Sequence, residues 1–398
     1  MKPTILLFQP YLRQHILNFG RGLQQVDFVW QQSKTKKFSY ATLPDFEREI
    51  RRRKDTWLVL FRRVLGIPNI RIKLTRRGDV LFTYGCFLFS NRPFITYLET
   101  GLAPFNYDVA IAKNPFARCI IALSIISPQC KQLIFMSEAS RKSFLTSVHY
   151  PSWITSIATQ KSCVVYPLVD TVAAPPKNWS GSLKLLFAGL FYMKGGMELA
   201  HAFEALRKKN ENITLTIITV LRMIRDQDLV YLQSIPGLTL VDATLNEQQM
   251  REMYRTHDIF VLPTFREGFG LVLIEALAHG MPIIATDQYA TTEMVVDNEN
   301  GFVYPDHPLK DYDSETFRML GKYYSPADFY ADLFRFQSEG KMQPIENFIE
   351  TSVEKFIFDP ALLERFSKSS LELYERKFSA QKISDQIEAI FLDSVSEK

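Results

Sequence analysis

Two glutamates, Glu267 and Glu275, are the residues of this sequence whose types and spacing best suit chemistry. They lie eight residues apart on either side of a segment that contains Gly268 and Gly270. Glycine lets the backbone approach an anion closely, and free N–H groups at a helix start carry partial positive charge. Carboxylates accept hydrogen bonds from hydroxyl groups. The pattern therefore predicts a site that binds a phosphate and a sugar ring.

The elements around these glutamates follow from the neighbouring residues. Residues 258–263 are an apolar run that ends in proline, which predicts a buried parallel strand followed by a loop, and residues 271–279 predict the next helix. Open α/β sheets bind ligands at the carboxyl ends of their strands, where Glu267 would lie. Because eight residues are a little over two helical turns, we expect Glu275 to follow Glu267 down roughly the same helix face.

Residues 266–275 resemble the Glu-x7-Glu motif of retaining glycosyltransferases of the GT-B type, a family 4 class that includes many bacterial surface-polysaccharide enzymes. The likeness continues downstream through residues 276–286 and 293–303. Upstream, residues 245–254 begin with a capping-box pattern that predicts the preceding helix. The resemblance covers residues 164–305 well and the first half of the chain only in outline.

The resemblance implies an α/β fold of the GT-B class, in which two Rossmann-like, doubly wound domains face a central cleft. The length of 398 residues also favours two domains. We predict a first, acceptor-binding domain (1–170), a linker rich in proline and polar residues (171–181), and a second, nucleotide-sugar-binding domain (182–375). An insertion of unknown role occupies about 306–345, and a last helix (376–398) would return to the first domain.

Apolar runs that alternate with helical segments predict the strands of both domains. In the first half these runs are residues 4–8, 26–30, 79–83, 94–98, 132–136 and 162–165. The second half begins with strand candidates at residues 183–189 and 213–220, with helices from about residue 346 onward.

Lys194 is the next candidate, because it lies on a glycine-flanked loop after the first strand of the second domain. By resemblance, this cation would reach the diphosphate of the donor; without the resemblance it would be an ordinary solvated lysine. Relatives usually carry an arginine directly after the glycine that Gly189 matches, whereas this chain has Leu190. Either Arg222 or Arg266 takes over that charge, or donor binding is weaker.

The resemblance also implies a role for each residue of the motif. A nucleotide-sugar donor loses a diphosphate while its anomeric carbon becomes cationic, so preorganised cations and N–H groups should provide most of the catalysis without a metal. Glu275 would accept both ribose hydroxyls, and Glu267 would lie near the donor sugar. The expected donor site comprises Gly189, Lys194, Arg266, Glu267, Gly268, Phe269, Gly270, Leu271 and Glu275.

Glu99 completes the expected catalytic set of Glu267, Lys194 and Glu99. It ends a strand candidate and precedes a loop, where a general base for the acceptor hydroxyl could lie; the alternative is a polar residue at a strand end. Many relatives use a histidine in this region, but this chain has none between His15 and His149. Residues 137–138, Ser-Glu, resemble a segment that lines the cleft and equally suit a plain helix start.

We expect no metal and no cofactor. Asp226 with Asp228, and Asp311 with Asp313, match the Asp-x-Asp pattern of metal-dependent glycosyltransferases, but neither pair follows a strand as that pattern requires. No Gly-x-Gly-x-x-Gly follows the first strand, so a dinucleotide-dependent dehydrogenase is unsupported. The four cysteines lack metal-ligand spacing and are expected to be reduced core thiols, at 86, 119, 130 and 163.

The charge is unevenly distributed, because residues 1–150 carry 23 Lys and Arg against 9 Asp and Glu. The basic half could face anionic lipid head groups or a diphosphate-linked acceptor. Residues 46–65 read as an amphipathic basic helix at a membrane surface, or as a helix packed on its own domain with an exposed basic face. No nucleic-acid motif accompanies the charge.

We expect a cytoplasmic location, peripheral at the inner face of the membrane. The first apolar run, residues 4–8, is too short for an export signal, and residues 119–126 are too few to span a bilayer. The sequence thus predicts a retaining glycosyltransferase that moves a sugar from a nucleoside-diphosphate donor to a hydroxyl of a glycan or lipid-linked glycan.

Two alternatives stay open. One is a catalytically degenerate, nucleotide-binding scaffold, which Leu190 and the absent histidine motivate. The other is a GT-B sugar-nucleotide epimerase or phosphorylase, which product analysis would separate from a transferase.

Overall fold

The structure is a computed structural model that places most of the chain. It describes residues 2–8, 14–30, 57–147, 150–169, 173–178, 180–323 and 325–396. Most of the predicted basic helix, residues 46–56, lies outside the described residues.

The first half forms a six-stranded parallel sheet with the strand order β2-β1-β4-β6-β7-β8. Its central strands are apolar and buried along their whole length, as strands with helices on both faces must be. All six strands predicted here are confirmed: β1 (Thr4–Leu7), β2 (Asp27–Trp30), β4 (Val80–Tyr84), β6 (Phe94–Leu98), β7 (Cys130–Phe135) and β8 (Ser162–Val164). A separate parallel pair, β3 (Ile70–Lys73) and β5 (Phe87–Ser90), was not predicted.

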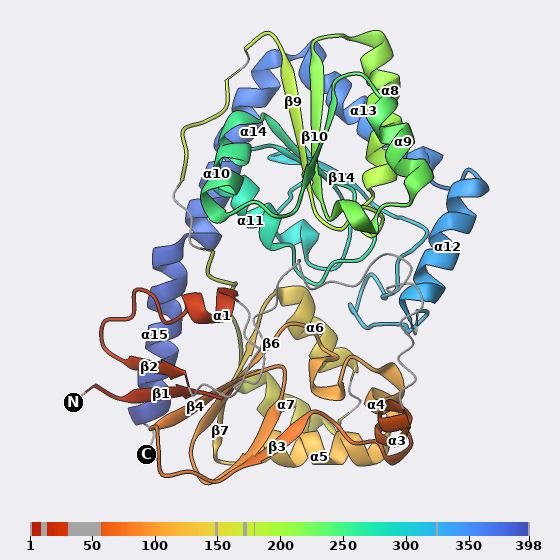
Figure 1. Cartoon of the computed structure of the whole chain (residues 1–398). Helices are drawn as coiled ribbons and strands as arrows, with labels where there is room; N and C mark the ends of the chain where they lie inside the picture. Colours follow the sequence, from red (N-terminus) through yellow and green to blue (C-terminus); the bar gives the residue numbers. More distant parts are fainter. Residues whose placement is uncertain are drawn as a thin grey trace.

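Short helices cover this sheet (Figure 1). They are α1 (Gln14–Asn18), α3 (Trp57–Leu65), α4 (Val109–Lys113), α5 (Pro115–Ile126), α6 (Glu138–Ser147), α7 (Ser152–Gln160) and the 3-10 turn η2 (Ala103–Phe105). Arg63 of α3 forms an ion pair of 3.2 Å with Asp108, the residue that caps α4. This part of the basic segment is therefore packed on its own domain.

The second half forms another six-stranded parallel sheet, with the order β11-β10-β9-β12-β13-β14. Its strands are β9 (Leu183–Ala188), β10 (Ile213–Thr219), β11 (Leu238–Asp242), β12 (Ile259–Leu262), β13 (Ile283–Thr286) and β14 (Gly301–Tyr304). The chain order reverses between β9 and β12, and ligands of such sheets bind in the crevice at that switch point. Two doubly wound parallel sheets confirm the predicted fold class.

The helices of the second half include the predicted helix after β12. They are α8 (Gly196–Lys209), α9 (Asp226–Ser234), α10 (Glu247–Thr256), α11 (Leu271–Ala278), α12 (Pro326–Ser338), α13 (Gln343–Phe358) and α14 (Pro360–Leu373), with the short turns η3 (Leu221–Met223), η4 (Thr291–Glu293) and η5 (Tyr374–Phe378). Helix α10 begins with the predicted capping box, in which Asn246 and Gln249 bond reciprocally. None of the described helices is both long and apolar enough to cross a bilayer.

The last helix, α15 (Ala380–Ser396), lies against the first sheet (Figure 1). The Phe391 ring packs 5.8 Å from the Phe28 ring and 5.4 Å from the Phe82 ring, measured between centroids. Glu388 accepts hydrogen bonds from the backbone N–H groups of Gln24 and Gln25 at 2.6 and 2.5 Å. The chain therefore ends on the domain in which it began.

The segment between β14 and α12 lies between the two sheets and contacts the first domain (Figure 1). Thr146 of α6 donates a hydrogen bond of 2.9 Å to the carbonyl of Thr316. An isolated bridge pairs Tyr312 with Met319. One cysteine departs from expectation: Cys119 is exposed, so the prediction of four core thiols is wrong for that residue.

Candidate active site

The loop that joins β12 to α11, residues 263–270, separates two pockets between the domains. One, here called the insertion pocket, has a volume of about 240 Å³ and is lined by residues of this loop, the first domain and the segment 309–329. The other, the α11 pocket, has a volume of about 520 Å³ and is lined by α10, α11 and residues of the first domain. Both pockets lie at the predicted edge of the second sheet.

Glu267 lies on this loop, not on the helix. Its Oε1 accepts hydrogen bonds from the N–H groups of Gly268 and Phe269 at 3.0 and 3.4 Å, and α11 begins only at Leu271. Gly270, with φ of 99°, caps the helix in a conformation that other residues rarely adopt. The prediction that the two glutamates share a helix face is therefore wrong: Glu267 lines the insertion pocket and Glu275 the α11 pocket.

Lys194 binds this loop from the turn that follows the neighbouring strand, β9. Its Nζ donates hydrogen bonds to the Glu267 Oε2 and the Arg266 carbonyl, both at 2.6 Å. The two charged side chains are only 15% and 17% exposed, so solvent screens their attraction weakly. A Cβ on Gly189 would lie 2.9 Å from the Lys194 Cγ, which explains the glycine at the end of β9.

Glu275 is half-buried on α11, and its Oε2 accepts a hydrogen bond of 2.6 Å from the Tyr254 hydroxyl. Burial raises the pKa of the Glu275 carboxyl above its usual value. Leu271 lines the same pocket. Tyr254 was not singled out from the sequence, although it ends the helix predicted directly before β12.

The first domain contributes to both pockets. Glu99 lies in the insertion pocket, where it accepts hydrogen bonds from the Tyr84 hydroxyl and, at 3.3 Å, from the Tyr107 hydroxyl. Its Oε1 lies 3.4 Å from the point that a Cβ on Gly268 would occupy, so it reaches the loop 263–270 across the cleft. His15 of α1, which sequence reasoning did not select, lines the α11 pocket.

The two arginines proposed to replace the missing cation differ in position. Arg266 lines the insertion pocket, with its guanidinium carbon 5.8 Å from the centroid of the Phe329 ring. Arg222 is exposed on η3 and lines neither pocket. Leu190 packs against the core of the second domain. Two further arginines line the α11 pocket, Arg21 and Arg251, and neither was selected from the sequence.

The aspartate pairs occupy unrelated surroundings. Asp228 bonds the Tyr192 hydroxyl and accepts a hydrogen bond of 2.6 Å from Arg225 at the start of α9. Asp313 accepts a hydrogen bond from the Thr316 backbone, whereas Asp311 lines the insertion pocket. Among the described residues, no group of three or more His, Cys, Asp or Glu side chains could hold a metal ion.

The Ser-Glu segment at residues 137–138 starts α6 and touches the second domain. The backbone N–H groups of Glu138 and Ala139 donate hydrogen bonds of 3.0 and 2.9 Å to the Glu293 carboxylate. The Tyr166 hydroxyl donates a third, at 3.0 Å. Glu293 of the second domain therefore caps a helix of the first.

Sequence comparison finds relatives of the second half of the chain. Residues 182–320 match the family model described as Glycosyl transferases group 1. The capsular polysaccharide biosynthesis glycosyltransferase CapM of Staphylococcus aureus is 27% identical over 50% of this chain and 42% of its own length. A D-inositol 3-phosphate glycosyltransferase of Arthrobacter is 32% identical over 33% of each chain. The chain thus spans less than half the length of these curated relatives.

Structure comparison extends the likeness to the whole chain. HepE of Anabaena, solved in complex with UDP and glucose, is 12% identical with a TM-score of 0.56 over 99% of this chain and 100% of that one. Sucrose-phosphate synthase of Thermosynechococcus elongatus is 14% identical with a TM-score of 0.59 over 100% of both chains. At these identities the likeness shows a shared fold.

Proposed function

Since residues 182–320 match the family model of glycosyl transferases group 1 and the chain has a GT-B fold, we propose that it belongs to this family and is a retaining glycosyltransferase. It would move a sugar from a nucleoside-diphosphate donor to a hydroxyl of a glycan or lipid-linked glycan. The observation that carries this proposal is the arrangement of Lys194, Glu267 and Glu275 around one loop at the switch point of the second sheet. Across the cleft, Glu99 faces that loop.

The nucleoside of the donor fits the α11 pocket. Its volume of about 520 Å³ lies within the range of roughly 300–1,000 Å³ typical of ligand sites. Leu245, Met250 and Leu271 offer apolar walls for a base, and the Glu275 carboxylate offers acceptors for ribose hydroxyls. The diphosphate would then lie between the first N–H groups of α11 and the ammonium of Lys194.

The Lys194–Glu267 pair suits the two charges that develop in the reaction. The leaving diphosphate gains negative charge, which Lys194 stabilises, while the anomeric carbon gains positive charge, which the Glu267 carboxylate stabilises. Glu99 would accept the proton of the attacking hydroxyl as the new glycosidic bond forms. Because Lys194 supplies the positive charge at the diphosphate, we propose that the reaction needs no metal.

Nucleotide binding tests the donor site directly. UDP, GDP and ADP are added separately in thermal unfolding of the wild type, Glu275→Gln and the control Glu364→Gln, whose exposed glutamate pairs with Lys368 on α14. A nucleotide at a hundred times its Kd should add about 2.7 kcal/mol. UDP is expected to stabilise the wild type and the control but not Glu275→Gln. If no nucleotide stabilises the wild type, the donor site is misplaced.

Turnover separates the transferase from its alternatives. Nucleoside-diphosphate release and the anomeric configuration of the product are followed by NMR in the presence of EDTA. A retained configuration with undiminished rate supports the proposal. Binding of nucleotide without turnover of any donor would favour a scaffold. A sugar of altered configuration formed without acceptor, as distinct from the unchanged sugar that hydrolysis releases, would favour an epimerase.

We also propose that the basic first domain contacts an anionic membrane surface in the cytoplasm. The proposal is supported by three apolar side chains that are exposed next to basic residues. Val64, Ile72 and Leu74 are 78%, 76% and 74% exposed. Co-sedimentation with phosphatidylserine vesicles, compared with phosphatidylcholine vesicles, tests this contact. Equal binding to both, or to neither, would contradict it.

A further inference from the structure

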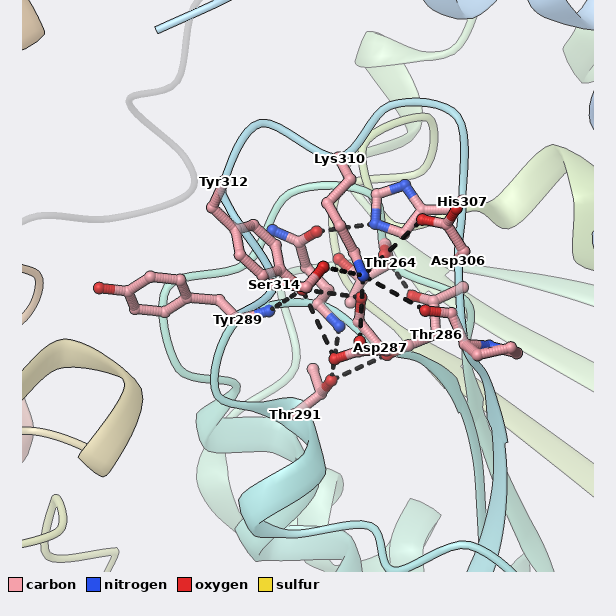
Figure 2. Close-up of polar contacts among 12 residues, drawn as sticks. Thr264, Thr286, Asp287, Tyr289, Thr291, Asp306, His307, Lys310, Tyr312 and Ser314 are labelled. Carbon is pink, nitrogen blue, oxygen red and sulfur yellow. Dashed lines mark hydrogen bonds and ion pairs between the residues drawn. The ribbon is translucent and has the colours of Figure 1, made fainter. Parts of the chain in front are cut away.

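Residues 306–323, part of the predicted insertion, are held firmly against the second sheet. Figure 2 shows a polar cluster that joins them to the segment after β13. Lys310 forms an ion pair of 3.0 Å with Asp287, and His307 Nε2 lies 2.7 Å from the Gln288 Oε1. The Tyr312 hydroxyl donates a hydrogen bond of 2.9 Å to the Asp287 carbonyl. Because Lys310 and His307 are buried, breaking these bonds would leave unpaired polar groups, so the segment is a fixed wall.

This wall closes one side of the insertion pocket. Asp311 and Tyr323 line it from the segment itself, and Phe329 lines it from the start of α12. The Tyr323 and Phe329 rings pack edge to face with centroids 5.5 Å apart, which fixes both aromatic side chains. The opposite side is formed by Glu99 and Tyr107 of the first domain. The pocket therefore exists only because the insertion is present.

The charges of the insertion pocket select against phosphate. Three carboxylates line it, those of Glu99, Glu267 and Asp311. The charge of Glu267 is offset by its ion pair with Lys194, so two carboxylates remain against the guanidinium of Arg266. An anionic group would be repelled, whereas hydroxyl groups donate strong hydrogen bonds to carboxylates. Its volume of about 240 Å³ is below the range of roughly 300–1,000 Å³ typical of whole ligand sites, which suits one ring better than a nucleotide sugar.

We propose that the insertion pocket binds the terminal neutral sugar of the acceptor, with Asp311 accepting a hydrogen bond from a sugar hydroxyl and Tyr323 providing an apolar wall. The inference rests on the proposed glycosyl transfer. A hydroxyl held there would lie between Glu99 and Glu267, the two residues assigned to its proton and to the anomeric carbon. Acceptor recognition would thus depend on an insertion of the second domain as well as on the first domain.

Binding and turnover are measured separately, so that the two proposals can fail independently. The probes are neutral methyl glycosides of glucose, galactose and N-acetylglucosamine, with glucose 1-phosphate as the anionic counterpart. Saturation-transfer NMR in the presence of UDP reports glycoside binding without requiring transfer. UDP-sugar hydrolysis without acceptor reports the donor site alone.

The variants are Asp311→Asn and Tyr323→Leu. Asparagine keeps an acceptor for the Lys322 N–H, which now bonds the Asp311 Oδ1 at 2.7 Å, so the fold should survive. The matched control is Asp313→Asn, two residues along the same segment and outside the pocket lining. We expect at least one neutral glycoside to bind the wild type and the control, with about tenfold weaker binding to Asp311→Asn and Tyr323→Leu, and no binding of glucose 1-phosphate.

Donor hydrolysis should stay within twofold in all three variants. The proposal is wrong if no neutral glycoside binds the wild type, if Asp311→Asn binds as the wild type does, or if Asp311→Asn raises the donor KM, since the pocket would then hold the donor sugar. If wild-type protein neither hydrolyses nor transfers any donor, glycosyl transfer itself fails. The NMR result still decides the sugar site in that case.

Discussion

Lys194 and Glu267 hold each other in place before any substrate binds. Their ion pair of 2.6 Å is mostly buried, and the same lysine also bonds the Arg266 carbonyl. A donor diphosphate brings negative charge that competes with Glu267 for this ammonium. Lys194 and Glu267 are thus already in place for the negative charge on the leaving diphosphate and the positive charge on the anomeric carbon. The two side chains need little reorganisation when these charges form.

Replacing the charge of Glu267 should slow the reaction without abolishing donor binding. Glu267→Gln keeps the shape and a hydrogen-bond acceptor for Lys194 but cannot stabilise a cationic anomeric carbon. We expect the kcat of nucleotide-sugar turnover to fall by about 10²–10³, as for loss of one stabilising group, with the thermal shift by the nucleotide preserved. Activity within threefold of wild type would remove Glu267 from the catalytic set. Glu364→Gln serves again as control.

Glu198 should make the stability depend on pH. It is buried on α8, its Oε1 accepts a hydrogen bond of 2.7 Å from Gln337, and burial raises its pKa to about 7. The folded state holds this proton more tightly than the unfolded state does. The contribution of Glu198 to the free energy of unfolding is therefore fully present below about pH 4.5 and is lost as the pH rises through about 7.

Glu198→Gln removes this dependence. The variant should therefore be more stable than wild type at pH 8, by on the order of 3 kcal/mol, with little advantage at pH 5. Urea unfolding at the two pH values measures the difference. An equal effect at both values would show that ionisation of Glu198 is not the cause.

Single residues were predictable where a motif or a strand end marked them. Glu267, Glu275 and Lys194 lie in the expected loops and helix of the second sheet. Tyr254 and Asp311 were not selected as binding residues. Tyr254 reaches its pocket because α10 packs against α11, and Asp311 reaches its pocket because the insertion packs against the first domain. No local pattern of sequence encodes such contacts.

At the scale of elements, a turn of the second domain and a helix of the first depend on each other. Glu293, at the end of η4, supplies the hydrogen-bond acceptors for the first N–H groups of α6. A carboxylate near a helix N-terminus also interacts favourably with the helix dipole. This contact holds the two domains together across the cleft.

Glu293→Ala should therefore loosen the closed arrangement. Loss of a helix cap costs about 0.5–2 kcal/mol, and here that energy stabilises the contact between domains. We expect a larger radius of gyration in small-angle scattering and weaker UDP binding. The control is Glu299→Ala, an exposed residue nearby in the chain. An unchanged radius of gyration would show that other contacts alone keep the domains closed.

Elements were predictable where apolar runs were long. The central strands, such as β4 and β12, are apolar and buried, and their positions followed directly from the sequence. Strand β3, with the sequence IRIK, alternates charged and apolar residues and is only partly buried, so no continuous apolar run marks it. The shape of the insertion depends on the distant Lys310–Asp287 pair, which no local pattern reveals.

At the scale of the whole molecule, α15 couples the stability of the two domains. Phe391 is fully buried between Phe28 and Phe82 of the first domain, although its helix continues from the second. Phe391→Ala should destabilise the protein by about 3–5 kcal/mol, because it leaves a cavity in a shared core. Urea unfolding, followed by fluorescence, measures the loss.

The matched control is Phe358→Ala, since Phe358 is 81% exposed at the end of α13. That change should stay within about 0.5 kcal/mol of wild type. Two separate unfolding transitions in Phe391→Ala, where the wild type shows one, would demonstrate the coupling most directly. A loss of less than about 1 kcal/mol would contradict a shared core.

Helix α15 reaches the first domain on one side of the molecule, whereas the insertion lies on the opposite side (Figure 1). If the domains rotate about this helix as a hinge, the hydrogen bond from Thr146 to the Thr316 carbonyl on the opposite side must break. Rotation about this hinge would open the cleft on the insertion side alone. An acceptor of the proposed transferase would then enter the cleft past the insertion.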